Sequence, residues 1–227
     1  MRVRVVSYNV QSFRAGTDPV AAVLTDLDPD LVMLQECGRK PNVARFAVSL
    51  GFEVASTHRP FNPVHNAVLF RPPWTLRSEE VRHFAREGKA LRRGMIAAQL
   101  QQGDESLTAV STHLGLVPRE RPHHAQELTD FLAGVEGPVV VGVDLNESHI
   151  DPAAHWLNHR LFDAFVHAEE AEPPGGRTFP AWKPAARIDY VFVNGDIEIH
   201  RAWVPNGPVA ARASDHRPVV ANLEFGE

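Results

Sequence analysis

The chain has 227 residues, of which 44% are hydrophobic and 22% are charged. This length permits one domain or two small ones, and it is sufficient to bury a full hydrophobic core. The single cysteine, Cys37, excludes a framework of disulfides within the chain. The net charge of −5 argues against a protein that holds long nucleic acid by bulk electrostatic attraction.

Eight short runs rich in valine predict β-strands, and several of them alternate apolar with polar residues, as half-buried strands do. In chain order these runs are Val3–Asn9, Leu31–Gln35, Ala67–Phe70, Met95–Leu100, Leu107–Thr112, Val139–Val143, Ile188–Val193 and Val219–Leu223.

Helix signals lie between these strands, at residues 18–28, 41–50, 119–132 and the stretch after 151. The first segment opens with Asp18 as a candidate N-cap and Pro19 in the first helical position, and it should end before Pro29. The second segment is closed by Gly51, a candidate C-cap.

The N-terminal residues alternate like a strand and lack the apolar core of a secretory signal. No stretch approaches the roughly 18 apolar residues that a membrane span needs. No composition shift or internal repeat divides the chain. We therefore expect a cytoplasmic protein without a membrane span, folded as a single domain over residues 1–227. Its fold class should be α/β, with two packed sheets and outer helices.

Polar side chains stand at the ends of the predicted strands, where a rigid scaffold can present catalytic groups to a loop-lined cleft. These residues are Asn9, Glu36, His113, Asp144, Asn146, Asp189, Asp215 and His216. Each alone has a structural explanation, because asparagine and aspartate satisfy turn backbones and one histidine among twelve is more often structural. Their recurrence at strand ends throughout the chain favours one shared site.

This set of carboxylates, amides and imidazoles suits metal-assisted hydrolysis of a phosphodiester. Glu36 and Asp215 can supply the oxygen ligands that a hard divalent cation requires. Asp144 can orient or deprotonate the attacking water. Asn9 and Asn146 can hold that water, a phosphate oxygen or the hydration shell of the metal.

The two histidines have a complementary use. His113 and His216 can donate to the non-bridging oxygens as charge develops in the transition state. Asp189 can fix the tautomer of an adjacent imidazole and raise its pKa. The sequence has no cysteine–histidine spacing for zinc, no glycine-rich phosphate loop and no Gly-X-Ser-X-Gly elbow.

The sequence resembles the endonuclease/exonuclease/phosphatase superfamily, which has the DNase I-like fold. The matching pieces span residues 7 to 218, and their ordered set is far more specific than any one of them. In the family's order they are Ser7-Tyr8-Asn9-Val10, Leu34-Gln35-Glu36, His65-Asn66-Ala67-Val68-Leu69, Arg93-Gly94-Met95, Ser111-Thr112-His113-Leu114, Gly142-Val143-Asp144-Leu145-Asn146, Arg187-Ile188-Asp189-Tyr190 and Ser214-Asp215-His216-Arg217-Pro218.

The resemblance implies a four-layer α/β/β/α sandwich, a requirement for Mg²⁺ or Mn²⁺, and cleavage of a phosphoester. The implied roles are metal ligation by Glu36, Asn9 and Asp215, action at the nucleophile by Asp144 and Asn146, pairing of Asp189 with His216, and a phosphate contact from His113. Arg93, Asn66 and Trp182 are the expected substrate contacts.

Several features bear on the substrate. The aspartate that abasic-site repair nucleases of this superfamily carry two residues after the first asparagine is Gln11 here. Trp182 is interpreted either as a stacking platform for a base or sugar, or as an anchor that packs its loop on the sheet. The stretch from Arg77 to Arg93 contains six basic and three acidic residues, which predicts either a solvated face or a positive rim that attracts a phosphate ester.

The leading hypothesis is a metal-dependent phosphodiesterase, and more specifically a nuclease that acts on DNA or short oligonucleotides. The alternative is a phosphoesterase for a small molecule or lipid, of the inositol phosphate or sphingomyelin type. A third hypothesis is a non-catalytic scaffold that binds another protein, which the complete set of candidate residues disfavours. The sequence leaves the oligomeric state open.

Overall fold

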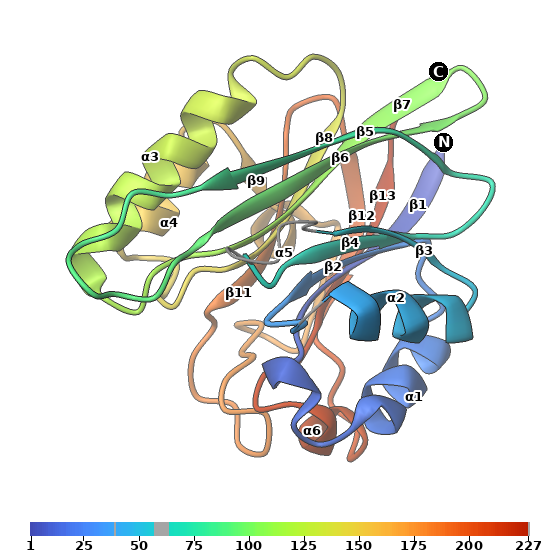
Figure 1. Ribbon diagram of the computed structural model, residues 1–227, viewed down its shortest axis with the longest axis horizontal. Helices are drawn as coiled ribbons and strands as arrows, with labels where there is room; N and C mark the ends of the chain where they lie inside the picture. The colour runs from blue at the N-terminus through green and yellow to red at the C-terminus, as the bar shows by residue number, and fades with distance from the viewer. Residues whose placement is uncertain (39, 57–63, 227) are drawn as a thin grey trace.

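Two mixed β-sheets packed face to face form the centre of the computed structural model, which describes residues 1–38, 40–56 and 64–226 (Figure 1). Within these residues the first sheet has seven strands, in the order β10 (Glu170–Glu172), β12 (Glu198–Trp203), β13 (Val219–Glu224), β1 (Arg2–Asn9), β2 (Leu31–Gln35), β4 (Ala67–Phe70) and β3 (Glu53–Ser56). The second sheet has six, in the order β5 (Thr75–His83), β6 (Gly94–Gln102), β7 (Glu105–His113), β8 (Val139–Asp144), β11 (Asp189–Val193) and β9 (Phe162–Asp163).

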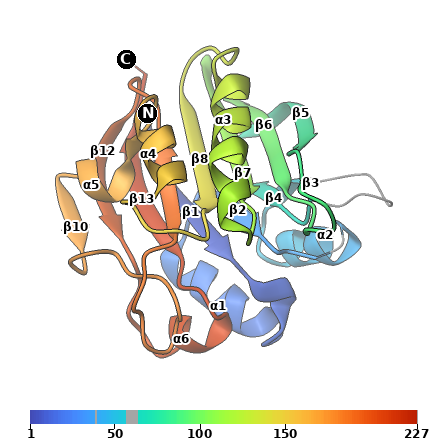
Figure 2. The same cartoon turned by 90° about the vertical axis from the view of Figure 1, so that its left-hand side faces the viewer.

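Helices cover the outer face of each sheet, so the predicted four-layer sandwich is confirmed (Figures 1 and 2). Helices α1 (Thr17–Leu27) and α2 (Lys40–Ser49) pack on the first sheet, and α3 (Arg121–Leu132) and α4 (Pro152–Asn158) pack on the second. Short helices α5 (Ala164–His167) and α6 (Ala210–Ala213) complete the fold. None of the helices in the described ranges is long and apolar enough to cross a membrane.

The period of two in the strands sorts their side chains between these layers. In β1, Val3 and Val5 enter the core between the sheets, whereas Val6 and Tyr8 pack beneath the helices of the first sheet. Burial of such apolar side chains is the main favourable term in folding, at about 25 cal/mol per Å² of apolar surface.

A buried polar cluster joins the sheets directly behind the strand ends. Gln35 Nε2 lies 3.3 Å from Ser7 Oγ and 3.2 Å from the carbonyl oxygen of Gly142 in the opposite sheet. A Cβ at Gly142 would lie 2.5 Å from the Cβ of Met33, so this close approach of the sheets requires glycine. The cluster fixes the relative position of the strand ends that carry the candidate residues.

All eight predicted strands are present, and their ends differ from the prediction by at most two residues. Strands β3, β5, β9, β10 and β12 were not predicted. Strand β5 is a sheet edge with a largely exposed, charged sequence, and β12 contains a bulge between Ile199 and Arg201, so neither shows a regular alternation of apolar residues.

The helix predictions need two corrections. Gly16, with φ 97°, precedes the first helix, so Asp18 lies within the first turn and is not the N-cap. The helix predicted from Arg119 begins as a 3₁₀ turn at Pro118–Glu120, and α3 starts at Arg121 because Pro122 suits only the first turn of an α-helix. Helix α1 ends before Pro29 as expected, and Gly51, with φ 76°, follows α2.

Candidate active site

Strand ends from both sheets meet at one end of the sandwich. Parallel strands β7 and β8 pair His113 with Asp144, and antiparallel β11 pairs Asp189 with the same Asp144. In the other sheet β1 ends at Asn9, and its parallel neighbour β2 ends one residue before Glu36. The registers of both sheets therefore deliver the candidate residues to the same edge.

Asp144 is buried at the centre of this group, and polar neighbours fix its carboxylate. Asn9 donates from Nδ2 to Oδ2 at 2.8 Å, and the backbone N–H of Asn146 donates to Oδ1 at 2.9 Å. Asn146 has left-handed backbone dihedrals, with φ 56°, which asparagine tolerates better than most residues. His113 Nε2 lies 3.2 Å from Asp144 Oδ2 and 2.9 Å from Asn146 Nδ2.

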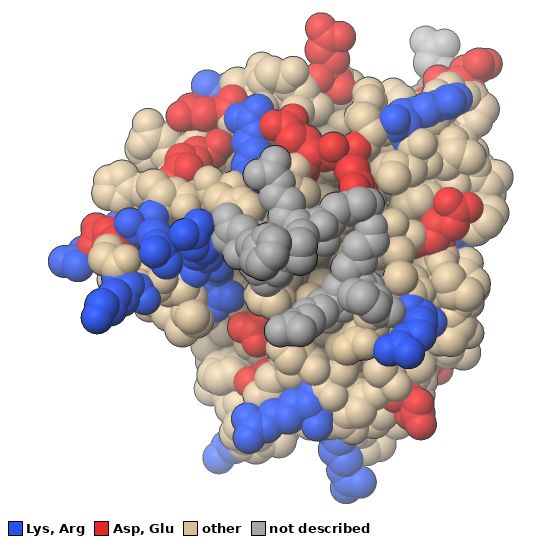
Figure 3. All heavy atoms as spheres, in the orientation of Figure 1, with Lys and Arg blue, Asp and Glu red and all other residues tan. Residues whose placement is uncertain are grey.

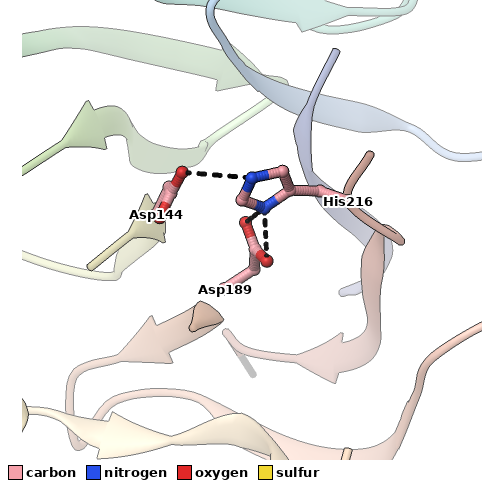
Figure 4. Close-up of side chains that lie close together, drawn as sticks. All are labelled: Asp144, Asp189 and His216. Atoms are coloured by element: carbon pink, nitrogen blue, oxygen red, sulfur yellow. Dashed lines mark hydrogen bonds and ion pairs between the residues drawn. The ribbon is translucent and has the colours of Figure 1, made fainter. Parts of the chain in front are cut away.

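His216 stands between two buried carboxylates (Figure 4). Its Nδ1 lies 2.9 Å from Asp189 Oδ2, and its Nε2 faces Asp144 Oδ2 at 3.9 Å. Asp189 in turn accepts a hydrogen bond of 2.5 Å from Thr178 Oγ1. The Thr178–Asp189–His216 chain orients the imidazole so that Nε2 is the nitrogen presented to Asp144.

The two imidazoles of the site carry different charges. Burial alone would lower the pKa of His216, but the combined attraction of Asp189, Asp144 and Asp215 outweighs it and raises the pKa to about 10. Burial lowers the pKa of His113 to about 3, against the attraction of Asp144. Near neutral pH the site therefore holds a cationic His216 and a neutral His113.

Glu36 occupies the partly exposed mouth of the site, where its backbone has φ 51°. Its Oε1 lies 3.7 Å from His113 Nδ1 and 3.8 Å from Arg93 Nη2. Burial raises the pKa of Glu36, whereas the guanidinium of Arg93 opposes that shift. Asn66 is fully buried and donates to the carbonyl oxygens of Gly94 and Ser111, so only its Oδ1 remains for a further contact.

Asp215 is held by Gln11, which stands where abasic-site repair nucleases of the superfamily have an aspartate. Gln11 donates from Nε2 to Asp215 Oδ2 at 2.9 Å, and its backbone N–H donates to Asn9 Oδ1 at 3.0 Å. Gln11, Ser12 and Phe13 all have positive φ, between 45° and 55°, so this turn after β1 is conformationally strained.

Trp182 is 69% exposed, so the interpretation that it anchors its loop on the sheet is wrong. The loop is fixed instead by the backbone of Ala181, whose N–H donates to the carbonyl oxygen of Asp215 at 2.7 Å. Arg217 Nε donates to the carbonyl oxygen of Ala181 at 2.7 Å. The indole is thus exposed on a loop whose backbone is bonded to Asp215.

Sequence reasoning missed the contributions of Thr178 and Gln11. Thr178 lies 11 positions before Asp189, and Gln11 lies 204 positions before Asp215. Only the presence of Thr178 in the loop before Asp189 could have suggested its contact, and no local signal points to the contact of Gln11.

Comparison with known proteins places this arrangement in a family. The model of the Endonuclease/Exonuclease/phosphatase family matches residues 6–216. The chain belongs to that family. The match confirms the resemblance identified from the sequence motifs. No curated protein matches the chain.

Solved structures show the fold of this endonuclease/exonuclease/phosphatase family at low identity. A family protein of Bacteroides vulgatus is 18% identical, with a TM-score of 0.86 and 100% coverage of both chains. The mannosyl-6-phosphatase of Bacteroides thetaiotaomicron is 18% identical, with a TM-score of 0.81 and coverage of 98% and 100%. The human Nocturnin catalytic domain with bound sulfate is 18% identical, with a TM-score of 0.76 and coverage of 99% and 95%.

Endonuclease/exonuclease/phosphatase family members hydrolyse phosphoester bonds and generally depend on a divalent metal ion. The residues present fit such an ion. Ligand atoms of Asp144, Asp189 and His216 lie within 4.8 Å of one another. His216 already faces Asp189 through Nδ1, so the more exposed carboxylates of Glu36 and Asp215 are better placed to offer oxygen ligands.

Buried polar atoms without a hydrogen-bond partner also indicate that this site can accept an ion or a phosphate. In the described part of the chain, Tyr8 Oη, Asn66 Oδ1, Arg93 Nε and His113 Nδ1 are buried without a hydrogen-bond partner. Buried polar groups are nearly always satisfied, so these four atoms are available to a further polar group, such as a hydrated ion or a phosphate.

The charge states of the two imidazoles lead to a first prediction. In metal-free protein, ¹⁵N chemical shifts should show His216 protonated on both nitrogens up to about pH 9, and His113 neutral down to about pH 5. An unfolded imidazole loses its proton near pH 6.5, so the stabilisation from His216 is fully present below about pH 6.5 and is lost as the pH rises toward 10. Titration of both imidazoles near pH 6.5 would contradict the assigned charges.

Proposed function

We propose that this protein is a divalent-metal-dependent phosphodiesterase, and that it acts as a nuclease on DNA or short oligonucleotides. The observation that carries the proposal is the arrangement around Asp144. A buried carboxylate, oriented by Asn9 and Asn146, faces the Nε2 of a cationic His216 across 3.9 Å. A base and a cationic donor this close together can contact two neighbouring oxygens, those of the attacking water and of the phosphodiester, and this suits hydrolysis of a phosphodiester.

In this proposal Asp144 accepts the proton of the attacking water while Asn146 holds that water in line. His216 donates from Nε2 to a non-bridging phosphate oxygen, where negative charge increases in the transition state. Asp189 and Thr178 keep the imidazole cationic and correctly oriented. Arg93 and the Nδ1 of His113 lie beside Glu36, where they can contact a second phosphate oxygen.

Glu36 and Asp215, with Asn9, would hold a Mg²⁺ or Mn²⁺ ion, and such an ion would supply Lewis-acid stabilisation of charge on the phosphoryl and leaving oxygens. Gln11 keeps the carboxylate of Asp215 in position through its hydrogen bond of 2.9 Å.

Hydrolysis of bis(p-nitrophenyl) phosphate tests the general reaction. We expect turnover with Mg²⁺ or Mn²⁺, loss of turnover with a chelator, and recovery when the metal is restored. Absence of hydrolysis with either metal would overturn the proposed activity and favour the scaffold hypothesis.

A substrate panel tests the nuclease assignment. Labelled single-stranded DNA, duplex DNA and RNA should be compared with sugar phosphates, inositol phosphates and sphingomyelin under the same metal conditions. A similar fold is found in a mannosyl-6-phosphatase, which makes sugar phosphates the most informative competitors. A higher kcat/KM for a sugar phosphate than for every nucleic acid would replace the nuclease assignment with that of a small-molecule phosphatase.

A further inference from the structure

A loop rich in basic residues leads directly into the candidate active site. It connects β5 to β6 and comprises residues 84–93, which we call the basic loop. Its last residue, Arg93, is buried beside Glu36, whereas Arg86, Lys89 and Arg92 are exposed. Figure 3 shows Lys and Arg side chains gathered on the left of the molecule, where Figure 1 places this loop.

Among the described residues, the exposed cations of the basic loop have no acidic partner. In the part of the chain that the structure describes, Arg86, Lys89 and Arg92 form no ion pair. The acidic residue of the loop, Glu87, is paired with Arg119 of the neighbouring 3₁₀ turn. The loop therefore projects uncompensated positive charge from a protein whose net charge is −5.

Three side chains at the start and along the length of α3 hold the backbone of the basic loop in place. Glu120 Oε1 accepts from the N–H of Glu87 at 2.7 Å, and Glu127 Oε1 accepts from the N–H of Ala85 at 3.0 Å. His124 Nε2 lies 2.7 Å from the carbonyl oxygen of Ala85. These bonds position the cations before any ligand arrives, which reduces the entropy lost on binding.

The base of the loop is closed in the same manner. The N–H of Phe84 donates to the carbonyl oxygen of Arg93 at 3.0 Å. The ring of Phe84 stacks on the imidazole of His124, with 5.0 Å between the ring centroids. Burial lowers the pKa of His124, so its ring is neutral and its Nδ1 can accept the N–H of Gly115, at 3.2 Å. One histidine thus connects the basic loop to the segment that follows His113.

Exposed apolar side chains lie in the basic loop and in the segment that His124 ties to it. Leu91 of the basic loop is 62% exposed, and Leu116, which follows Gly115, is 56% exposed. Trp182, on the separate loop that bonds to Asp215, is 69% exposed. Proteins that bind single-stranded nucleic acid stack bases on such exposed side chains, above all aromatic ones, while Lys and Arg contact the backbone.

We infer that the basic loop is the docking surface for the phosphates that flank the scissile phosphate on a single-stranded nucleic acid, with Arg86, Lys89 and Arg92 as the contacts. The inference rests on the proposed function and names the residues that select a polymer over a small ester. It also explains how an acidic protein can bind a polyanion, since the attraction is local and adjoins the reaction centre.

Salt dependence of binding tests the docking surface without requiring turnover. Fluorescence anisotropy of a labelled single-stranded oligonucleotide, with chelator present, gives the association constant over a range of salt concentrations. Phosphate contacts with a single strand contribute about −0.7 each to the slope of log K against log salt, so the three loop residues should together account for about −2 of the slope. Arg86→Gln, Lys89→Gln and Arg92→Gln should each make the slope shallower by about 0.7.

Arg77→Gln is the matched control, because Arg77 is an exposed arginine near the opposite end of β5 and bonds to Gln101. It should leave the slope unchanged. Equal slopes in wild type and all three loop variants, or an equal change in the Arg77 control, would overturn the inference. Weaker binding of phosphatidylserine vesicles in the loop variants, with oligonucleotide binding unchanged, would overturn it in favour of a membrane surface.

Hydrolysis of bis(p-nitrophenyl) phosphate by the wild-type protein separates this inference from the proposed function. If the diester is hydrolysed and the oligonucleotide slopes do not respond to the loop variants, the docking surface is wrong and the activity remains. If the slopes respond and the diester is not hydrolysed, the surface binds nucleic acid and the catalytic proposal is wrong.

Discussion

Replacement of Asp144 by asparagine should lower kcat for a phosphodiester by about 10²- to 10⁴-fold, as the loss of a general base does. The substitution preserves the size of the side chain and removes its charge. It also places an NH₂ group against either Asn9 Nδ2 or the N–H of Asn146, each of which donates to Asp144. The variant therefore loses both the base and part of its orientation.

Asp104→Asn provides the matched control for this prediction. Asp104 is an exposed aspartate in the turn between β6 and β7, at the far end of the strand that ends in His113. We expect this variant to keep wild-type kcat and melting temperature. For Asp144→Asn, thermal unfolding must show a folded protein, and a kcat within threefold of wild type would remove Asp144 from the role of base.

The strands were predictable because their signal is local. Buried strands such as β2 and β8 are continuous apolar runs that end at a polar residue. That change in polarity marks the end of the strand, and the candidate residue is either the last residue of the strand, Asp144, or the next one, Glu36. Edge strand β5 is partly exposed along its length, so its charged sequence carries no such signal.

The connections within the site were not predictable, because they depend on how the two sheets are placed. Asp189 was expected to pair with His216, but the second hydrogen bond of Asp189, from Thr178, depends on the path of the loop before β11. The contact of Gln11 with Asp215 requires a strained turn after β1, which no propensity of the sequence favours.

The basic residues between Arg77 and Arg93 illustrate the same limit. The sequence shows the excess of positive charge but cannot separate its parts. The structure buries Arg93 beside Glu36, pairs Arg82 with Glu80, and leaves Arg86, Lys89 and Arg92 exposed on a loop held by α3. Among the described residues, Arg86, Lys89 and Arg92 form no ion pair and lie on the loop that ends at the site, because folding gives each basic residue different neighbours.

Replacement of His216 by alanine should lower kcat by about 10²- to 10³-fold, because the transition state loses its cationic hydrogen-bond donor. Removal of the imidazole also leaves Asp189 and Asp144 as buried carboxylates without their shared cation, so we expect lower thermal stability. His216→Gln keeps a neutral hydrogen-bond donor of similar reach. If the positive charge of the imidazole is what stabilises the transition state, the kcat of this variant should also fall below that of the wild type. His200→Ala is the control, since His200 is a surface imidazole that also pairs with a carboxylate, Glu224.

The coupling between His216 and Asp189 distinguishes a chemical role from a purely structural one. Because Asp189 is expected to act only through the imidazole, the double variant His216→Ala/Asp189→Asn should have the kcat of His216→Ala alone. Asp189→Asn by itself should lower kcat and should also shift the ¹⁵N titration of His216 from about 10 toward lower pH, since its largest source of attraction is removed. Additive losses in kcat, with an unchanged titration of His216, would show that Asp189 supports the fold and that the imidazole does not need Asp189 to carry its charge.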